Sequence, residues 1–430
     1  MRDVSLLLFT ALRIRFDDFR MKVCGVICEL NPFTSGHEYL FKNARSITGA
    51  DYIIAVLSGD FVQRGMPAIV DKYARCTAAL NGGADLVIEL PAIYATASAD
   101  YFAYGGVTLL DSLGCVDFLV FGSESGDIDL LKSCAGLDVK EKDEVHIMSQ
   151  GHNTSEVVAH KINKLLREGM SYPKAYAAVT GNEVASNDML GIRYIKSIDM
   201  RMSGMTPVAI KRRGSAYLDD GPSSQSASAV RKRILNKEDY AHLVPKYSLR
   251  GLENCKGVTC PVVINDFGPQ LYAVIDTLIR SGAELTDYMD VSQNIEGHIR
   301  TKFNDFKSYE DFAQLIHTKE YTKSRILRAL LHIMLDIRKE DYPEALADCE
   351  AHYARILGFR QSSKELLSRI KESSLIPVIS KAGDAGKILD DEAMDIFEKD
   401  VHAAGMYDKA CVFKFGKKPS HDFAEQIVIL

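Results

Sequence analysis

A turn rich in chemically useful residues follows the first buried segment of the chain. From Glu29 to His37 the sequence reads ELNPFTSGH, after an apolar run and before a helix-like pattern. Backbone N–H groups and the positive dipole end at a helix start bind anions. Gly36 would let the backbone approach a phosphate, and Thr34 and His37 could donate hydrogen bonds as charge develops there. The turn predicts a phosphate site; a plain turn with His37 capping or packing on the helix is the alternative.

A second element with phosphate chemistry lies between Ser223 and Arg233. Hydroxyl groups and backbone amides at the predicted helix start, followed by Arg231, suit the β- and γ-phosphates of a nucleotide. An ordinary Ser-capped surface helix with a basic face is the alternative. The two elements together favour a nucleotide site.

Alternating strands and helices must position these residues. Near-continuous apolar runs predict strands at 23–28, 52–57, 85–90, 117–121 and 207–212. Helical patterns lie between or after them at 36–47, 71–81, 99–113, 160–167, 190–198 and 227–235. This is the pattern of an α/β protein with a Rossmann-like, doubly wound parallel sheet, which binds ligands beyond the carboxyl ends of its strands.

Two domains are expected from a chain of 430 residues. The alternation fades after about residue 240, where helical patterns remain at 298–306 and 322–338. We therefore predict a catalytic domain over 21–240 and a mainly α-helical C-terminal domain over 241–430. The apolar part of residues 1–20 is too short to cross a membrane, and we interpret these residues as an extension outside the fold.

Composition restricts the class of protein further. A net charge of −6 argues against a generally basic nucleic-acid coat but leaves room for a local basic groove. The nine cysteines, an odd number without a disulfide-framework pattern, favour a reducing cytoplasm. Cys255 and Cys260 have no second Cys or His pair at zinc spacing, so no protein metal site is expected.

The motifs resemble the HxGH/TxGH nucleotidylyltransferase superfamily and, more specifically, the bacterial tRNA(Met) cytidine acetate ligases. The turn from Glu29 to His37 is similar to the superfamily signature, and Ser226–Arg231 is similar to its Ser/Thr-rich phosphate motif. Further similar segments are 58–65, 67–72, 85–91, 121–127, 187–191, 210–217 and 322–331. The ligases usually have His at the position of Thr34, a difference that the wider superfamily accepts.

The resemblance implies a ligase that uses ATP as a substrate. Such an enzyme activates acetate as acetyl-adenylate and then acetylates N4 of the wobble cytidine of elongator tRNA(Met). Activation is needed because the lone pair of the cytosine amine is delocalised into the ring. Mg²⁺ is expected to bind through the ATP phosphates. A small-molecule adenylyltransferase and a non-catalytic RNA-binding protein on the same scaffold are the alternatives.

The resemblance also indicates which residues contact ATP. They are Ile27, Cys28, Glu29, Leu30, Asn31, Pro32, Phe33, Thr34, Ser35, Gly36, His37, Glu38, Tyr39, Leu40, Gly122, Asn187, Arg212, Ser226 and Arg231. Catalytic roles are expected for His37, Thr34 and Arg212, the last by pairing with a phosphate or stabilising developing charge. The alternatives are a strand-ending turn at Gly122, a helix N-cap at Asn187 and a surface basic cluster around Arg212.

An acidic chain must concentrate its basic side chains in order to bind tRNA. Candidates are Lys211 and Arg213, and Lys323, Arg325 and Arg328 on the helical pattern 322–338. Arg325 and Arg328 are three positions apart and share a helix face, with an apolar stripe opposite. An ordinary solvated face is the alternative.

Overall fold

The structure is a computed structural model of the chain. It describes residues 21–136, 185–212, 226–417 and 422–430, together with 161, 164–165, 177–179 and 419. Residues 1–20, most of the predicted helix 160–167 and Arg213 lie outside the described residues. The extension at 1–20 therefore stays a prediction.

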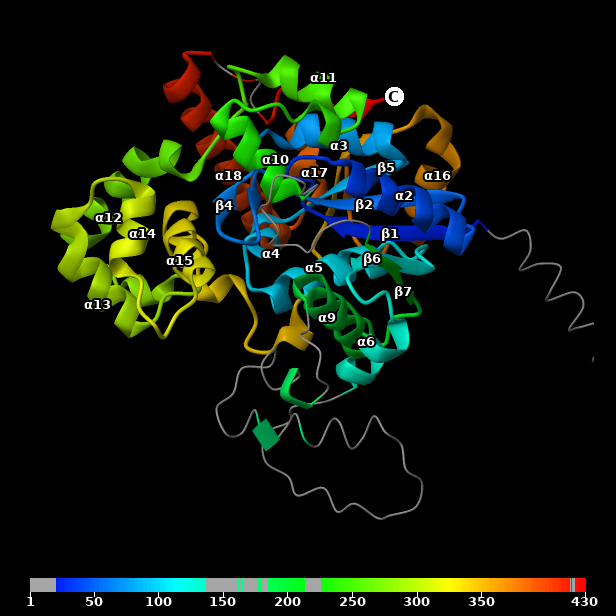
Figure 1. Cartoon of the computed structure of the whole chain (residues 1–430), viewed down its shortest axis with the longest axis horizontal. Helices are drawn as coiled ribbons and strands as arrows, with labels where there is room; N and C mark the ends of the chain where they lie inside the picture. The colour runs from blue at the N-terminus through cyan, green and yellow to red at the C-terminus, as the bar shows by residue number, and fades with distance from the viewer. Residues whose placement is uncertain are drawn as a thin grey trace, which may run out of the picture.

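A mostly parallel sheet forms the centre of the molecule (Figure 1). The strands predicted from sequence are all present, as β1 (Val23–Cys28), β2 (Tyr52–Ser58), β5 (Leu86–Leu90), β6 (Phe118–Ser123) and β7 (Thr206–Lys211). They pair in parallel in the order β5-β2-β1-β6-β7. The winding reverses between β1 and β6, and doubly wound sheets bind ligands at the carboxyl side of such a switch point. The predicted fold class is confirmed.

Helices cover both faces of this sheet. One face carries α2 (Ser35–Thr48) and α3 (Lys72–Gly82), and the other carries α5 (Ala99–Ser112), α6 (Ile128–Ala135) and α9 (Ser186–Met200) (Figure 1). Cys24 and Val26 belong to the core beneath α2 and α3, whereas Val23 and Ile27 belong to the core beneath α5. Successive residues of a strand point to opposite faces, which explains why nearly all of β1 is apolar.

Shorter elements complete this part of the chain. A hairpin of β3 (Phe61–Val62) and β4 (Met66–Pro67) follows β2, and α4 (Ala92–Ala95) precedes α5. Helices α10 (Ala227–Asn236) and α11 (Lys246–Cys255) lie at the top of Figure 1.

The chain after residue 240 first builds a helical lobe beside the sheet. It contains α12 (Gly268–Ser281), α13 (Gln293–Lys302), α14 (Tyr309–Ile316) and α15 (Lys323–Leu335), to the left in Figure 1. The predicted helices at 298–306 and 322–338 correspond to α13 and α15, and α13 ends earlier in a 3-10 turn at Phe303–Asp305. Then follow α16 (Lys364–Ser373), α17 (Ala385–Ile388) and α18 (Asp391–Phe415). None of the helices in the described ranges is long and apolar enough to cross a membrane.

The sheet itself continues past the boundary predicted near residue 240. Strand β8 (Ala354–Phe359) pairs antiparallel with β5, and β9 (Val378–Ile379) and β10 (Val428–Ile429) pair with β8. Buried ion pairs join the same regions, because Lys72 Nζ lies 2.8 Å from Glu89 and 2.9 Å from Asp422. The chain after residue 240 is therefore not a domain separate from the sheet. The predicted boundary near residue 240 stays a prediction, and it applies to the helical lobe alone.

Candidate functional site

A cavity of about 380 Å³ opens at the carboxyl ends of β1 and β6. Its wall combines the turn after β1, the first turns of α2, α9 and α10, the ends of β6 and β7, and the β3–β4 hairpin. The predicted residues in the wall are Ile27, Cys28, Glu29, Leu30, Asn31, Thr34, Ser35, Gly36, His37, Tyr39, Leu40, Gly122, Asn187, Arg212, Ser226 and Arg231. The fold thus brings the two predicted phosphate elements together at the switch point of the sheet.

Hydrogen bonds from distant segments hold the turn after β1 in place. Asn31 is 5% exposed, and its side-chain oxygen accepts a hydrogen bond from the Ile69 N–H at 2.8 Å. Its backbone carbonyl accepts one from Arg231, 200 positions away in the sequence. The Ser248 hydroxyl donates to the Phe33 carbonyl at 2.8 Å. Asn31 therefore shapes the turn through both its side chain and its backbone.

His37 caps its own helix and also faces the cavity. Thr34 is the N-cap of α2, and its backbone N–H donates to His37 Nδ1 at 3.0 Å. Since Nδ1 accepts this hydrogen bond, the proton of a neutral imidazole lies on Nε2. The capping role that was the alternative to a phosphate role is thus present, and it is what orients the Nε2–H donor.

The ring of His37 is neutral at physiological pH. Burial, and secondly the positive charge of Arg212, lower the pKa of His37 to about 3. A neutral His37 donates a hydrogen bond from Nε2 without carrying a full charge into the site. The positive charge that faces a bound phosphate comes instead from arginine side chains and helix ends.

The first turn of α10 carries the second group of predicted phosphate donors. Ser226 is its N-cap, and its hydroxyl accepts a hydrogen bond from the Ala229 N–H at 3.1 Å. Arg231, one turn further on, donates from Nη2 to the Ser228 hydroxyl at 2.9 Å and from Nη1 to Asn31. The same guanidinium therefore fixes α10 against the turn after β1, and the N-termini of α2 and α10 both face the cavity.

The ends of β6 and β7 close the other side of the wall. A Cβ placed on Gly122 would lie 3.4 Å from Arg212 Cγ, so the arginine stem packs across this glycine. Asn187 donates from Nδ2 to Glu124 Oε1 at 2.5 Å. The N-cap of α9 is Ala185, so Asn187 lies inside the first turn and the alternative reading of it as an N-cap is wrong.

Comparison with known proteins identifies the family. Residues 21–419 match the family model described as HIGH Nucleotidyl Transferase. The chain is 36% identical over 398 residues to the tRNA(Met) cytidine acetate ligase of Caldanaerobacter subterraneus subsp. tengcongensis, which covers 90% of this chain and 95% of that protein. This chain belongs to the tRNA(Met) cytidine acetate ligase family.

Further members of the ligase family agree with this assignment. The tRNA(Met) cytidine acetate ligase of Acetivibrio thermocellus is 35% identical over 432 residues, covering 95% of this chain and all (100%) of that protein. The crystal structure of Thermotoga maritima TmcAL bound with alpha-thio ATP superposes with a TM-score of 0.79 at 29% identity. The superposition covers 95% of this chain and 100% of the Thermotoga maritima chain. The apo form of the same ligase gives a TM-score of 0.80.

Three predicted ATP contacts of this ligase family member do not line the cavity. Pro32 and Phe33 are buried, and the Phe33 ring packs 5.9 Å from that of Phe41 and 5.8 Å from that of Tyr247. Glu38 forms an ion pair with Lys42 at 3.0 Å, one turn along α2. A continuous stretch of motif was expected to touch the nucleotide, but the turn and helix direct only part of it towards the cavity.

Other wall residues were missed by reasoning from sequence. They are Val62, Gln63, Arg64 and Met66 in the hairpin, and Phe102, Phe121, Leu190, Tyr194 and Ile210 on the sheet and its helices. Ala227 and Ser228 also line the wall, and they lie inside the predicted phosphate element without having been singled out. The hairpin lies in a segment that resembles the ligase family, and this was a usable signal. The apolar residues look like core residues in sequence and carried no signal.

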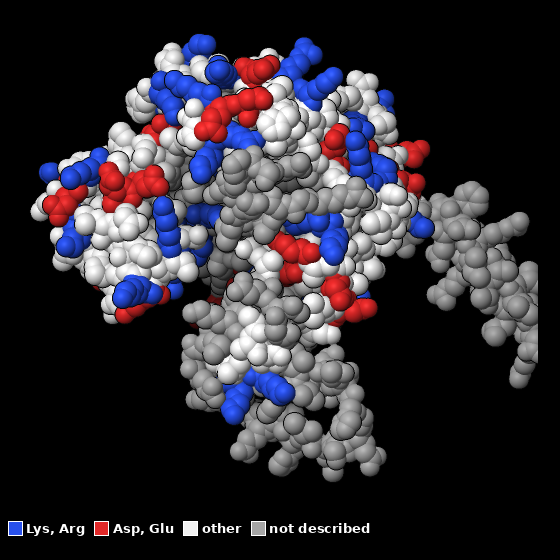
Figure 2. Space-filling model, in the orientation of Figure 1, with Lys and Arg blue, Asp and Glu red and all other residues white. Residues whose placement is uncertain are grey.

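The predicted tRNA contacts have different environments in the structure. Lys211 is exposed at the end of β7, and the Lys323 and Arg325 side chains on α15 are 55% and 41% exposed. Arg328 is 8% exposed and pairs with Asp290 through Nε at 2.7 Å. Its side chain is therefore neither accessible for the predicted contact with tRNA nor part of the solvated face that was the alternative. Figure 2 shows basic and acidic side chains interspersed over the lobe and over the α10–α11 region.

The described part of the chain offers no protein cage for a metal ion. Within these residues, no three His, Cys, Asp or Glu side chains are grouped so that they could hold a metal. Cys28, the thiol in the cavity wall, has its pKa raised to about 12 by burial and stays protonated. The chemistry that the wall can perform is therefore anion binding and charge stabilisation by hydrogen-bond donors, arginines and helix ends.

Proposed function

We propose that this chain uses ATP to activate acetate as acetyl-adenylate and then acetylates N4 of the wobble cytidine of elongator tRNA(Met). One observation supports this most directly. The N-termini of two helices, the Nε2–H donor of His37 and the guanidinium of Arg212 surround one cavity at the switch point of the sheet. A member of the acetate ligase family with this cavity has the parts that an attack on an α-phosphate requires.

In the first step a carboxylate oxygen of acetate attacks the α-phosphorus of ATP. The new O–P bond forms as the bond from the α-phosphorus to the bridging oxygen breaks, and pyrophosphate leaves. His37 Nε2–H and Arg212 stabilise the charge that develops on the α-phosphate oxygens. The first turn of α10 binds the leaving β- and γ-phosphates, and the adenosine lies towards Gly122 and Asn187.

In the second step the N4 amine of cytidine attacks the acetyl carbonyl carbon of acetyl-adenylate. The C–N bond forms, the C–O bond to the phosphate breaks, AMP leaves as an anion, and N4 gives up one proton to water. The donors that stabilised the α-phosphate in the first step also stabilise AMP as it leaves. The cavity therefore serves both steps without a covalent enzyme intermediate.

Mg²⁺ fits this scheme as an ion bound through the phosphates of ATP. Mg²⁺ commonly binds with substrate phosphates and retained waters, and neutralises phosphate charge. For tRNA we propose contacts by the exposed Lys211, Lys323 and Arg325, and we place the reaction in the cytoplasm.

The proposed function is tested by incubation of the purified protein with ATP, Mg²⁺ and labelled acetate, with and without elongator tRNA(Met). The RNA is then digested and analysed for N4-acetylcytidine. We expect ATP-dependent label in acetylcytidine with the wild-type protein and none above background with His37→Ala. If acetate is ignored while ATP still binds, the ligase proposal is wrong and adenylylation of phosphorylated small molecules is the next assay. Failure to bind ATP would favour a non-catalytic RNA-binding protein.

A further inference from the structure

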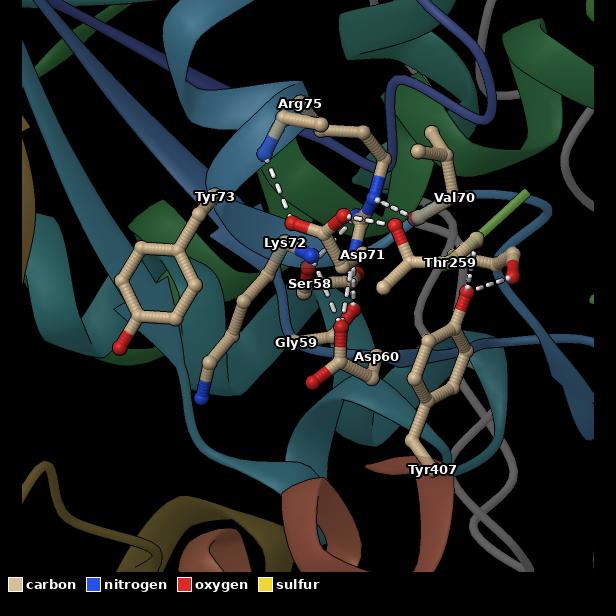
Figure 3. Close-up of polar contacts among 12 residues, drawn as sticks. Ser58, Gly59, Asp60, Val70, Asp71, Lys72, Tyr73, Arg75, Thr259 and Tyr407 are labelled. Atoms are coloured by element: carbon tan, nitrogen blue, oxygen red, sulfur yellow. Dashed lines mark hydrogen bonds and ion pairs between the residues drawn. The ribbon is translucent and has the colours of Figure 1, made fainter. Parts of the chain in front are cut away.

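A fully buried arginine lies directly behind the cavity wall without being part of it. Arg75, in the first turn of α3, is 1% exposed and is absent from the wall. Among the residues that the structure describes, its guanidinium donates to backbone carbonyls alone: Nε to Val70 at 3.0 Å, Nη1 to Glu29 at 2.9 Å and to Ser58 at 2.8 Å, and Nη2 to Gly59 at 2.5 Å. Figure 3 shows the Arg75 side chain together with Ser58, Gly59 and Val70.

The four carbonyls belong to the loops that build the site. Glu29 is the first residue after β1, Ser58 is the last residue of β2 and Gly59 follows it, so the arginine joins the carboxyl ends of two adjacent strands. Val70 follows Ile69, whose N–H holds the side chain of Asn31. Arg75 therefore contacts the turn after β1 (Glu29 to His37, called the nucleotide turn below) directly through Glu29. It also supports this turn indirectly, through the segment before α3 that holds Asn31.

Glu29 connects this arginine to the hairpin in the cavity wall. While its carbonyl accepts from Arg75, its carboxylate Oε1 accepts a hydrogen bond from the backbone N–H of Gln63 at 3.0 Å. Gln63 and the turn that carries His37 are both parts of the wall. Glu29, held by the guanidinium of Arg75, therefore fixes the position of the nucleotide turn relative to the hairpin.

The choice of arginine at this position is informative. A guanidinium presents N–H donors in a planar fork and can serve several carbonyls at once, whereas a lysine ammonium has three donors at one point. The neighbouring Lys72 is just as buried, but its ammonium pairs with the carboxylates of Glu89 and Asp422. The nearest carboxylate oxygen to Arg75 is 3.7 Å away, on Asp60. Arg75 therefore interacts with its surroundings mainly through hydrogen bonds to backbone carbonyls, and less through an ion pair.

We propose that Arg75 is a positioning residue of the ligase reaction. It holds the turn after β1 against the hairpin and thereby sets His37 Nε2 at the α-phosphate, without touching the substrate. The kinetic part of this inference rests on the proposed function, and its structural part does not. Contacts to ATP from α10, β6 and β7 are not held by this guanidinium, so its loss affects kcat more than the affinity for ATP.

The test uses the full chain with Arg75→Lys and Arg75→Gln, and with Arg355→Lys as a matched control. Arg355 is 3% exposed and pairs with Glu89 at 3.1 Å and Asp422 at 2.7 Å, away from the nucleotide turn. Hydrogen–deuterium exchange is measured for the amides of residues 30–38, with those of α12 in the helical lobe as an internal reference. Thermal melting, kcat and KM for ATP are measured for each protein.

We expect both Arg75 variants to fold and to exchange the 30–38 amides faster, relative to α12, than the wild type or Arg355→Lys. A misplacement of about 1 Å costs on the order of 100-fold in rate, and kcat should fall by that order while KM for ATP changes by less than about fivefold. Arg75→Lys, which keeps the charge and some donors, should be less impaired than Arg75→Gln.

Three results would overturn the inference. The first is exchange of the 30–38 amides in the Arg75 variants that is no faster than in Arg355→Lys. The second is a kcat of the Arg75 variants within about threefold of wild type, the range of a small rearrangement. A third is loss of cooperative melting in both variants, which would make Arg75 a residue of the fold alone. If the wild-type protein itself does not acetylate tRNA, the proposed function fails, and the exchange result still decides the positioning role.

Discussion

The replacement of His37 by Asn separates the two tasks of this side chain. Nδ1 accepts the Thr34 N–H at 3.0 Å and caps α2, while Nε2–H points to the place proposed for the α-phosphate. The amide oxygen of Asn can take the position of Nδ1, but nothing in Asn reaches the position of Nε2. In Gln, the longer side chain can bring an N–H group close to that position. His37→Asn should therefore keep the cap and lose the donor.

The expected sizes of the two effects follow from these contacts. Loss of one preorganised donor to transition-state charge costs about 100- to 1,000-fold in kcat, or roughly 2.7–4 kcal/mol. Loss of an N-terminal cap costs about 0.5–2 kcal/mol of stability, which His37→Asn avoids and His37→Ala does not. His37→Asn should thus melt close to wild type with a kcat reduced by about two to three orders of magnitude. His37→Gln should retain a larger share of the activity.

Steady-state acetylation of tRNA under saturating ATP and acetate gives kcat, and thermal melting gives the stability of each variant. A kcat for His37→Asn within about threefold of wild type would show that Nε2 donates nothing to the transition state. Equal stabilities for the Asn and Ala variants would refute the capping role. Either result would contradict the protonation state deduced from the Thr34 contact.

Three further changes test other features. The pKa of His37 in the folded protein is about 3, below the ordinary 6.5. The free energy of unfolding of the apo-protein should therefore fall as the pH drops from 6.5 towards 3, because the unfolded state binds a proton that the folded state does not. Urea unfolding midpoints measured across this pH range should fall less steeply for His37→Asn than for wild type. Gly65→Ala places a Cβ 2.4 Å from the backbone of α15 at a φ of +71°, whereas Gly257→Ala at +70° meets open space; denaturant melts should show a loss of about 1–3 kcal/mol for the second and a larger loss for the first. Lys72→Met strands buried carboxylates and should cost about 3–5 kcal/mol, against about 0–1 kcal/mol for Lys42→Met on the surface, by the same melts.

The parallel core and the two turns that line the cavity could be predicted because their signals are local. The apolar run of β1, the turn from Glu29 to His37 and the capped helix at Ser226 each occupy a few consecutive residues. Their periodicity and chemistry are visible without knowledge of the rest of the chain. The assignment of most of this turn to the cavity wall follows from the same signals, combined with the switch-point rule for doubly wound sheets.

The features that could not be predicted depend on contacts between distant segments. Arg75 looks like a surface arginine in a helical pattern, and only the fold shows that it lies under two strand ends. Arg328 shares a helix face with the exposed Arg325, yet Asp290 and the hairpin cover it. Strand β8 is six residues long and follows a helical lobe, so no alternation marks it as part of the sheet.

The place of β8 and β10 in the sheet has a consequence for how the protein is made. The ribosome releases the N-terminal strands first, but β5 has no partner on one side until residues 354–359 have emerged. Lys72 cannot complete its buried ion pairs until Asp422 has been synthesised, and β10 ends one residue before the end of the chain. The nascent chain therefore carries an open sheet edge and an incompletely paired buried charge through most of its translation. A chain that stopped before residue 420 would contain the whole turn after β1 but would lack Asp422 and β10.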